Sequence, residues 1–354
     1  MQTEVYNMAV RRVTMQDIAD ACGLSRNTVS KIFNKRGSVP QATQQMVLKK
    51  AQEMGYLQPP AAMRPSQAES RTIVLLTSHM PSDYHFGTFF IPAFADQLSR
   101  VGYTLMMCEV SPAELQNGTL PDHVDRERIA GLLTIELFDQ EYLDMLCGLN
   151  LPVIRVDSYY GSELMPLKCD VISMENVSSM VSITRHVIVA GAKRIGFVGD
   201  IRHCSSFHER WQGFCLAMEQ AGLPIDSQCC IRDSDGDLYG DLDWLESKFQ
   251  AMPRLPDAFV CANDFLALKI LAALKRRGVR VPEQILVSGF DGTPQSAIVD
   301  PSLTTARIPS AEIGRLAADL LLERIHNPDR PLQRIYVQTT PIWRNSTDPG
   351  AARQ

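Results

Sequence analysis

The chain has 354 residues, of which 45% are hydrophobic, and it carries 35 Lys and Arg against 40 Asp and Glu. This length exceeds one small domain and allows sizeable hydrophobic cores. No apolar stretch reaches the roughly 18 residues of a membrane span, and no signal-peptide run opens the sequence. We therefore expect a cytoplasmic or nucleoid-associated protein that has no membrane partner.

The charges are unevenly distributed along the chain. Residues 1–71 hold ten basic and five acidic residues, whereas the remainder holds 25 basic and 35 acidic ones. A positively charged head on a negatively charged body is typical of a nucleic-acid reader with a separate soluble domain. Because the body would repel DNA, we expect the head to make the contact.

The nine cysteines give no metal or cofactor signal. None forms a CxxC pair, and no Cys/His spacing indicates zinc, so we expect no metal and no cofactor. Most lie in apolar runs and are interpreted as buried, reduced thiols. The adjacent pair Cys229 and Cys230 is unusual, and the sequence assigns it no redox role.

After a lead of residues 1–11, residues 12–57 are predicted to form a helical head. Thr14 is suited to cap a first helix whose positive end Asp17 favours, and Gly23 permits the left-handed turn that ends it. Ser25 is suited to cap a second helix. The apolar residues at helical spacing are Ile18, Ala21 and Cys22 in the first helix, and Val29, Ile32 and Phe33 in the second, with the small Ala19 at the crossing.

The second helix leaves Arg26, Asn27 and Lys31 pointing outward. A helix-turn-helix places such a helix in the major groove of DNA, with its first turn at the base edges. Short polar side chains suited to phosphate oxygens surround it: Thr14, Ser25, Thr28, Ser30, Asn34 and Thr43. The alternative is an ordinary helix corner with a solvated polar face. The scarcity of acids on this face favours DNA binding.

The pattern T-x-x-D-I-A-x-x-x-G-L-S-x-x-T-V-S-K, followed by Asn34 and the helix QQMVLKKAQEMGY, resembles the DNA-binding domain of the lactose-repressor (LacI/GalR) family. The resemblance implies that Arg26, Asn27 and Lys31 read bases. It places the Ser and Thr residues above, together with Tyr56, against the DNA backbone. The apolar stripe of the third helix is interpreted as core: Val47, Leu48, Ala51 and Met54.

Residues 58–71 (QPPAAMRPSQAESR) are rich in Pro, Ala and Ser and are predicted to be a hinge or linker. Members of the family carry an Ala-x-x-Leu hinge helix whose Leu enters the minor groove. Ala62 matches that pattern, but Pro65 stands at the Leu position, and proline disfavours continuation of a helix. Two hypotheses follow: Met63 serves as the wedge, or the linker stays extended and bends DNA less.

From residue 72 onward, short apolar strands alternate with helices. Strands are expected at 72–77, 104–108, 129–135, 152–157, 194–200, 229–233, 258–263 and 285–291. Helices are expected between the strands. The first has Phe90, Phe94, Leu98 and Val101 on one face, and later helices are expected at 177–190, 209–221, 240–251 and 264–277. Fully apolar strands of this kind predict parallel sheets that are covered on both faces.

Two such sheets make a two-lobed α/β body, residues 72–354, with a cleft between the lobes. Segments such as LPVIRVD, HVIVAGAKRIGFVGD and SGFDGTPQSAIVDPSLTTARIP extend the family resemblance. It implies a periplasmic-binding-protein-like body of two Rossmann-like parallel sheets behind the all-α helix-turn-helix head. Lobe 1 is expected at about 72–173 and 308–337, and lobe 2 at about 174–305 and 338–346.

Ligands of open α/β sheets bind at the carboxyl ends of the strands. Polar residues follow the predicted strands there: Ser78-His79, Asp157, Asp200, Asn263-Asp264 and Asp291. The family resemblance assigns effector contacts to Arg210, which precedes Gly213 by three residues, and to Asp291 and Asn263. A guanidinium and a carboxylate together suit a sugar or polyol. Alternatively, Arg210 and Asp291 pair with each other. Asp264 is interpreted as a helix cap or an interface residue.

Four further residues are weaker effector-site candidates: His79, Phe86, Ser206 and His208. Phe86 is suited to stack on a sugar, although a lone Phe more often belongs to a core. Many family members place an aromatic residue five positions before the Gly that matches Gly240, where this chain has Asp235. An acid at that position disfavours phosphorylated or carboxylated effectors unless a cation intervenes.

These features predict a sequence-specific transcriptional regulator, a repressor by the family's usual output, that binds a palindromic double-stranded operator as a homodimer. A small metabolite, a sugar by resemblance, is expected to control it, as inducer or as corepressor. No leucine heptads follow Trp343, which favours a dimer over a tetramer. The alternatives are a cytoplasmic α/β enzyme acting on a sugar and a solute-binding protein. The sequence lacks three common motifs of nucleotide-binding and hydrolytic enzymes, GxGxxG, GxxxxGK[ST] and GxSxG.

Overall fold

The computed structural model describes residues 14–33, 39–54, 71–80, 87–234, 237–348 and 350. The chain divides into two units, Met1–Ser70 and Arg71–Gln354, which we treat separately as the head and the body. Several residues of interest lie outside the described residues, and the predictions for them stay predictions: Asn34, Tyr56, Ala62, Met63, Pro65, Phe86 and Asp235.

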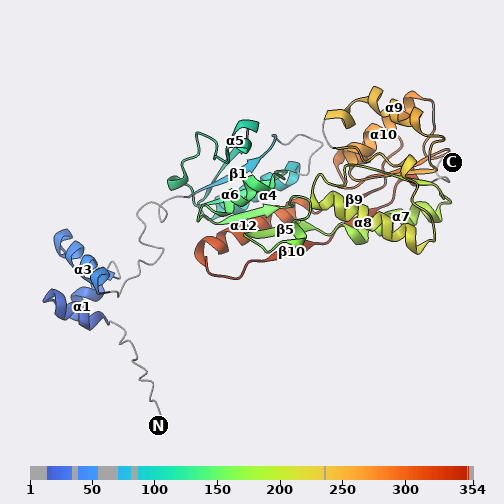
Figure 1. Cartoon of the computed structure of the whole chain (residues 1–354). Coiled ribbons are helices and arrows are strands. Elements are labelled where there is room, and N and C mark those ends of the chain that lie inside the picture. The colour runs from blue at the N-terminus through green and yellow to red at the C-terminus, as the bar shows by residue number, and fades with distance from the viewer. Residues whose placement is uncertain are drawn as a thin grey trace, which may run out of the picture. The chain divides into compact units, whose positions relative to one another are not determined.

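The described part of the head consists of α1 (Met15–Cys22), α2 (Arg26–Phe33) and α3 (Gln41–Glu53) (Figure 1). Thr14 begins α1 as predicted: its Oγ1 accepts the N–H of Asp17, whose carboxylate accepts the N–H of Thr14 at 2.7 Å. Gly23 ends α1 with φ 65°. Ser25 Oγ accepts the N–H of Thr28 at 3.1 Å and so caps α2.

The core of the head is built from one apolar face of each helix. Its buried members are Ile18, Ala19, Val29, Ile32, Val47 and Ala51, with Cys22, Leu24, Val39 and Met54 packed beside them. Of the apolar positions predicted for the three helices, this core contains Ile18, Cys22, Val29, Ile32, Val47, Ala51 and Met54. Leu48 is only partly buried and is not part of it, and the side chain of Phe33 lies outside the described residues. Ala21, which recurs at helical spacing with Ile18, is exposed, and the buried small residue of α1 is Ala19.

The first lobe of the body contains a six-stranded sheet in which every pairing is parallel. Its strands are β1 (Thr72–Thr77), β2 (Thr104–Glu109), β3 (Gly131–Ile135), β4 (Val153–Val156), β5 (Asp170–Met174) and β10 (Arg334–Val337), in the order β10-β5-β4-β3-β1-β2. The late strand β10 pairs with β5, so the chain returns to this sheet near its end.

Helices cover both faces of this sheet, which explains why its strands are apolar throughout. They are α4 (Gly87–Arg100), α5 (Pro112–Asn117), α6 (Gln140–Cys147) and α12 (Ser310–His326). Leu75 shares one core with Phe90 on α4, whereas its neighbour Leu76 shares the opposite core with Tyr142 on α6. Val101 was wrongly placed on the buried face of α4: the helix ends at Arg100, and Val101 is exposed.

The second lobe contains a parallel three-stranded sheet, β6-β7-β8, with strands Ile195–Val198, Ala258–Cys261 and Leu286–Ser288. Its helices are α7 (Val177–Val189), α8 (Ser205–Gln220), α9 (Leu242–Ala251), α10 (Asp264–Arg276) and α11 (Pro294–Ile298). An antiparallel pair, β9 (Thr305–Arg307) and β11 (Thr340–Ile342), completes the body. Short 3-10 turns lie at Arg126–Arg128, Ser162–Leu164, Ser227–Cys229 (η4), Asp237–Gly240 (η5) and Asn345–Thr347.

The strand expected at residues 229–233 is wrong. Asp226 accepts the N–H of Gln228 and starts η4, so only Ile231 reaches the sheet, through an isolated bridge to Val198. The prediction of two parallel α/β sheets behind a helical head is otherwise confirmed.

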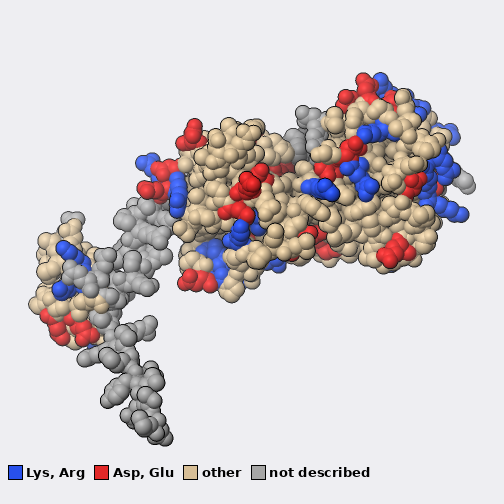
Figure 2. Space-filling view, viewed as in Figure 1, with Lys and Arg blue, Asp and Glu red and all other residues tan. Residues whose placement is uncertain are grey.

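The surface of the body in Figure 2 carries Lys and Arg interspersed with Asp and Glu, and no extended area of one sign covers this face. No helix in the described ranges is both long and apolar enough to cross a lipid bilayer.

Candidate functional site

The head presents the predicted reading residues on its surface. Arg26, Asn27 and Lys31 are exposed on α2, while Val29 and Ile32 of the same helix are buried against α1 and α3. Figure 2 shows that basic and acidic side chains gather on separate parts of the head face in view. An exposed basic and amide-bearing first turn, on a helix fixed by its other face, has the chemistry needed to meet base edges.

The hydroxyl residues predicted to contact phosphates differ in their local roles. Thr14 and Ser25 are exposed but also cap their helices, and Ser25 Oγ lies 2.8 Å from Thr28 Oγ1. Ser30 and Thr43 are partly exposed, Thr43 in the first turn of α3. A substitution at Thr14 or Ser25 would therefore disturb the fold as well as any DNA contact.

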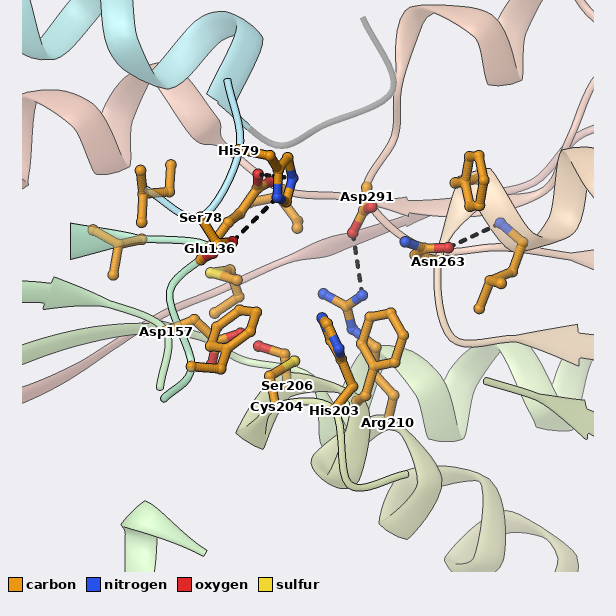
Figure 3. Close-up of a pocket in the computed structure, with 18 of the residues that line it drawn as sticks. Ser78, His79, Glu136, Asp157, His203, Cys204, Ser206, Arg210, Asn263 and Asp291 are labelled. Carbon is orange, nitrogen blue, oxygen red and sulfur yellow. Dashed lines mark hydrogen bonds and ion pairs between the residues drawn. The ribbon is translucent and has the colours of Figure 1, made fainter. Parts of the chain in front are cut away.

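A cavity of about 600 Å³ lies between the two lobes, and we call it the interlobe cavity (Figure 3). The first lobe contributes residues at or just after the carboxyl ends of its strands: Ser78, His79, Ile135, Glu136, Phe138, Val156, Asp157 and Met174. The remaining lining residues are His203, Cys204, Ser206, Phe207, Arg210, Gly240, Asn263, Phe265, Leu266, Asp291 and Ile308. The carboxyl ends of both parallel sheets thus face one space, as expected for ligand-binding α/β proteins.

Arg210 on α8 is the best-anchored polar group of the cavity. Its Nε donates to Asn176 Oδ1 at 2.9 Å, and its Nη1 donates to the Ala262 carbonyl at 2.8 Å. Nη1 also lies 3.2 Å from Asp291 Oδ1, and the guanidinium sits 3.9 Å from the centroid of the Phe290 ring. The alternative in which Arg210 and Asp291 pair is therefore present in the structure, although both side chains also line the cavity.

Glycine is required at position 213 of the Arg-x-x-Gly motif because α8 packs closely against α7 there. A Cβ at this position would lie 2.6 Å from the Val177 carbonyl oxygen and 2.9 Å from Met180 Cβ. Only glycine allows α8 to approach α7 this closely. The close contact fixes the helix that carries Arg210 one turn earlier.

Asp291 follows β8 with φ 119°, and its backbone is held by hydrogen bonds to Ala306 and Ile308. Burial raises the pKa of Asp291 to about 7; the cation of Arg210 lowers it, and the nearby Asp264 raises it further. Asp264 is itself fully buried, and burial raises its pKa to about 6 in spite of hydrogen bonds from Thr305 and Thr293. Asp291 is thus paired with Arg210, whereas the cation that lowers the pKa of Asp264 is Arg344.

Asn263, and not Asp264, is the cap of α10. Asn263 Oδ1 accepts the N–H of Leu266 at 2.9 Å and so caps α10, and the residue still lines the cavity. Asp264 is the first residue of α10, and it accepts the Thr305 hydroxyl at 2.6 Å and the Thr293 N–H at 2.8 Å. The cap assignment for Asp264 is wrong: it fastens α10 to the segments after β8 and does not reach the cavity lining.

His79 forms an ion pair with Glu136 across the ends of β1 and β3, with 3.1 Å between Nε2 and Oε2 (Figure 3). The hydrogen bond to Glu136 raises the pKa of His79, against the effect of partial burial. Ser78 Oγ donates to the Glu136 carbonyl, which fixes the same corner. The predicted His79 is thus brought to the cavity together with an acid that the sequence reading did not select.

Ser206 lines the cavity as expected, but the prediction for His208 is wrong. His208 Nε2 lies 3.0 Å from Gln212 Nε2, its ring packs at 4.8 Å from that of Tyr160, and the residue is not part of the lining. Positions 206 and 210 are four apart on α8 and share a face, whereas 208 lies on the other side of the helix.

The sequence reading missed several residues of the lining. Asp157 was noted at a strand end but not selected; it lines the cavity while its Oδ1 accepts the Ser158 N–H at 2.7 Å. The ring of His203 packs 5.0 Å from Phe138 and 5.1 Å from Phe207. Position after a buried strand could have identified Glu136, but the aromatic residues carry no signal that separates them from core residues.

Comparisons with known proteins agree with this architecture. The model for bacterial regulatory proteins of the lacI family matches residues 14–58, and that for a periplasmic binding protein-like domain matches residues 184–347. The HTH-type transcriptional repressor PurR of Haemophilus influenzae is 28% identical over 329 residues, which cover 91% of this chain and 94% of that protein.

Solved structures show the same fold. The transcriptional regulator CelR in complex with cellobiose superposes with a TM-score of 0.68 at 23% identity, covering 95% of this chain and 100% of that one. The lac repressor dimer bound to operator and the anti-inducer ONPF gives a TM-score of 0.68 at 22% identity, covering 95% and 99%.

The lacI family model and the curated relative PurR are those of transcriptional regulators and give no support to the alternative of an α/β enzyme. The helix-turn-helix head likewise distinguishes the chain from a solute-binding protein. The chain belongs to the lacI family of bacterial regulatory proteins, with a periplasmic binding protein-like domain as its body.

Proposed function

We propose that this chain is a transcriptional repressor whose affinity for a palindromic operator is controlled by a small metabolite in the interlobe cavity. The observation that carries the proposal is the cavity itself, because its polar groups come from both lobes. A ligand that contacts both lobes stabilises one arrangement of the lobes over others. If DNA binding also differs between these arrangements, effector and operator are thermodynamically linked.

The charges of the cavity favour a neutral, hydroxyl-rich effector. Three carboxylates line it, at Glu136, Asp157 and Asp291, against the guanidinium of Arg210 and the imidazole of His79. Arg210 and His79 are each already paired with one of these acids. A phosphate or carboxylate on the ligand would therefore meet excess negative charge, whereas hydroxyls can donate to the carboxylates.

The aromatic residues of the cavity add to this preference. Phe138, Phe207 and Phe265 offer apolar surface for the faces of a sugar or a similar ring. The similarity to a regulator solved with cellobiose supports the same ligand class. We therefore propose a neutral sugar or polyol as the effector.

The operator-bound lac repressor is a dimer, and we propose a dimer for this chain as well. A two-fold dimer presents two copies of α2, which would match the two half-sites of a palindromic operator. In this proposal Arg26, Asn27 and Lys31 read bases, and the first lobe supplies the dimer interface.

Thermal-shift screening of the full chain tests the effector class. The panel contains neutral sugars, polyols and nucleobases, each sugar accompanied by its phosphate and its acid form. We expect a neutral compound to raise the Tm and its anionic forms to have little effect. Stabilisation by the phosphorylated or acid forms alone would contradict the proposed ligand class.

Selection of DNA from a random pool tests the other half of the proposal. We expect enrichment of a palindromic site by the full chain, with binding that weakens as salt concentration rises. Binding to selected and random DNA with equal affinity would contradict sequence-specific repression.

A further inference from the structure

Cys229 and Cys230 are adjacent in the chain, and their thiols converge on one acceptor. Cys229 Sγ donates to the Asp226 carbonyl at 3.2 Å, and Cys230 Sγ donates to the same oxygen at 3.5 Å. Neighbouring side chains of an extended strand point to opposite faces. Here η4 ends at Cys229, and the turn brings both sulfurs to the same side of the segment.

Cys230 has the surroundings of a reactive thiol. The backbone N–H of Phe197 on β6 donates to its Sγ at 3.4 Å, and the residue is only partly buried. Cys229 and this N–H lower the pKa of Cys230, and Arg232 lowers it further, while burial opposes the shift. The guanidinium of Arg232 is itself positioned 4.8 Å from the ring centroid of Trp211. A thiolate on Cys230 is therefore stabilised by a fixed donor and a nearby cation.

Two other thiols serve as internal references. Cys215 on α8 is also partly buried, but burial raises its pKa to about 11 and the neighbouring Cys230 raises it further. Cys229 is fully buried, and its hydrogen bond to Cys230 raises its pKa. Among these three neighbours, Cys230 is the one that favours the thiolate form.

We propose that Cys229 and Cys230 form an oxidation site for hydroperoxides, in which Cys230 is attacked first and Cys229 is the resolving thiol. The Cys230 thiolate attacks one peroxide oxygen, the O–O bond breaks, and a sulfenic acid and hydroxide form. The Cys229 sulfur then attacks the sulfenic sulfur, and the S–OH bond breaks to release water. In sum, the two thiols lose two electrons and two protons, and the hydroperoxide is reduced to water and, if organic, an alcohol.

Oxidation of the two cysteines is expected to affect the second lobe, because Cys229 packs against β6. A Cβ at Gly196 on β6 would lie 2.1 Å from the Cys229 carbonyl oxygen, so the backbone of Cys229 is packed directly on this strand. A disulfide removes the Cys229 S–H donor from the Asp226 carbonyl and changes the acceptor of the Phe197 N–H. Since β6 leads into the loop that carries His203 of the interlobe cavity, oxidation is expected to loosen this part of the second lobe.

The test uses the full, reduced chain at pH 7. Brief alkylation with iodoacetamide, followed by peptide mass spectrometry, is expected to label Cys230 at least about tenfold faster than Cys215, because the thiolate fractions differ. Hydrogen peroxide is expected to remove the mass of two hydrogen atoms and to link Cys229 to Cys230, with a measurable fall in Tm.

Three variants assign the roles. Cys229→Ser is expected to accumulate a dimedone-trappable sulfenic acid on Cys230, and Cys230→Ser is expected to lose both the rapid alkylation and the disulfide. Cys215→Ser is the matched control and is expected to react as the unmodified chain does. Equal alkylation of Cys215 and Cys230, a disulfide mapped to a different pair, or a Cys229→Ser variant that forms no sulfenic acid would overturn the proposal.

Discussion

Nη1 of Arg210 lies 3.2 Å from Oδ1 of Asp291, and both groups line the interlobe cavity. The guanidinium is fixed by further hydrogen bonds to Asn176 and to the Ala262 carbonyl. Asn176 Nδ2 in turn donates to Glu209 at 2.7 Å, so the pair is part of a continuous polar network. A ligand would meet a donor and an acceptor that are already oriented, which reduces the entropy lost on binding.

Asp291→Asn is expected to weaken effector binding by about 2 kcal/mol, roughly thirtyfold in Kd, because a charged hydrogen-bond acceptor becomes a neutral one. Isothermal titration calorimetry with the effector from the thermal-shift screen measures this change. The shape of the side chain is kept, so the fold is expected to survive. An unchanged Kd would remove Asp291 from the effector site.

Arg210→Met is expected to cost more stability than Asp291→Asn, because it leaves Asp291, Asn176 and the Ala262 carbonyl without their donor in a buried site. We expect a loss of about 3–5 kcal/mol, as for breaking one partner of a buried ion pair. Urea unfolding of both variants gives the comparison. Equal losses would indicate that the pair is not anchored as described.

The stability of the body is expected to fall as the pH rises from about 4 to 7. Burial raises the pKa of Asp291 to about 7, whereas carboxyl groups of this type titrate near 3.9 in unfolded chains. Between these values the folded state binds more protons than the unfolded state, so this contribution is lost as the pH passes the folded pKa. Asp291→Asn is expected to flatten the dependence of Tm on pH over this range; parallel curves would contradict the shift.

Gly213→Ala is expected to destabilise the body by about 1–3 kcal/mol, because the added Cβ overlaps the Val177 carbonyl and Met180 in a close-packed contact. Gly240→Ala is the matched control, since a Cβ at Gly240 meets no described atom within 4 Å. Denaturant unfolding should separate the two variants. If both variants lose the same free energy of unfolding, the close contact between α8 and α7 is not the reason for glycine at position 213.

Arg26→Ala and Asn27→Ala are each expected to cost about 1–3 kcal/mol at one matched base pair and to relax specificity there. Thr43→Ala should weaken binding to all sequences by a similar factor. Thr43 is the better backbone control, because Ser25 also caps α2 and its loss would destabilise the head. Binding to single-base operator variants measures the difference. Intact base preference in Arg26→Ala would show that α2 is not the reading helix.

Much of the fold could be predicted because local patterns and tertiary structure agree. The strand predicted at residues 72–77 is β1 with the same bounds, since an uninterrupted apolar run needs cover on both faces and finds it. An apolar run does not always form a strand, and residues 229–233 are such a case. The apolar residues of this segment pack against β6. Asp226 caps the 3-10 turn η4, however, so the backbone does not form a strand.

The candidate site could be predicted only where a residue's position follows from a strand end or a helix face. Asp291 and His79 lie within three residues after strands β8 and β1 and reach the cavity. His208 was misplaced because α8 starts at Ser205 and not near 209, which changes the face on which each residue lies. His79 and Glu136 follow strands that are neighbours in the sheet but far apart in the sequence, so no local sequence pattern predicts their contact.

The most direct test of the account is the linkage between effector and operator in the full chain. Fluorescence anisotropy gives the Kd for the selected palindromic DNA with and without saturating effector, for the unmodified chain and for Asp291→Asn. We predict that effector changes the operator Kd at least about fivefold, a coupling of about 1 kcal/mol or more, and that Asp291→Asn requires higher effector concentrations for the same change. An operator Kd that does not respond to any ligand that stabilises the body would contradict the account.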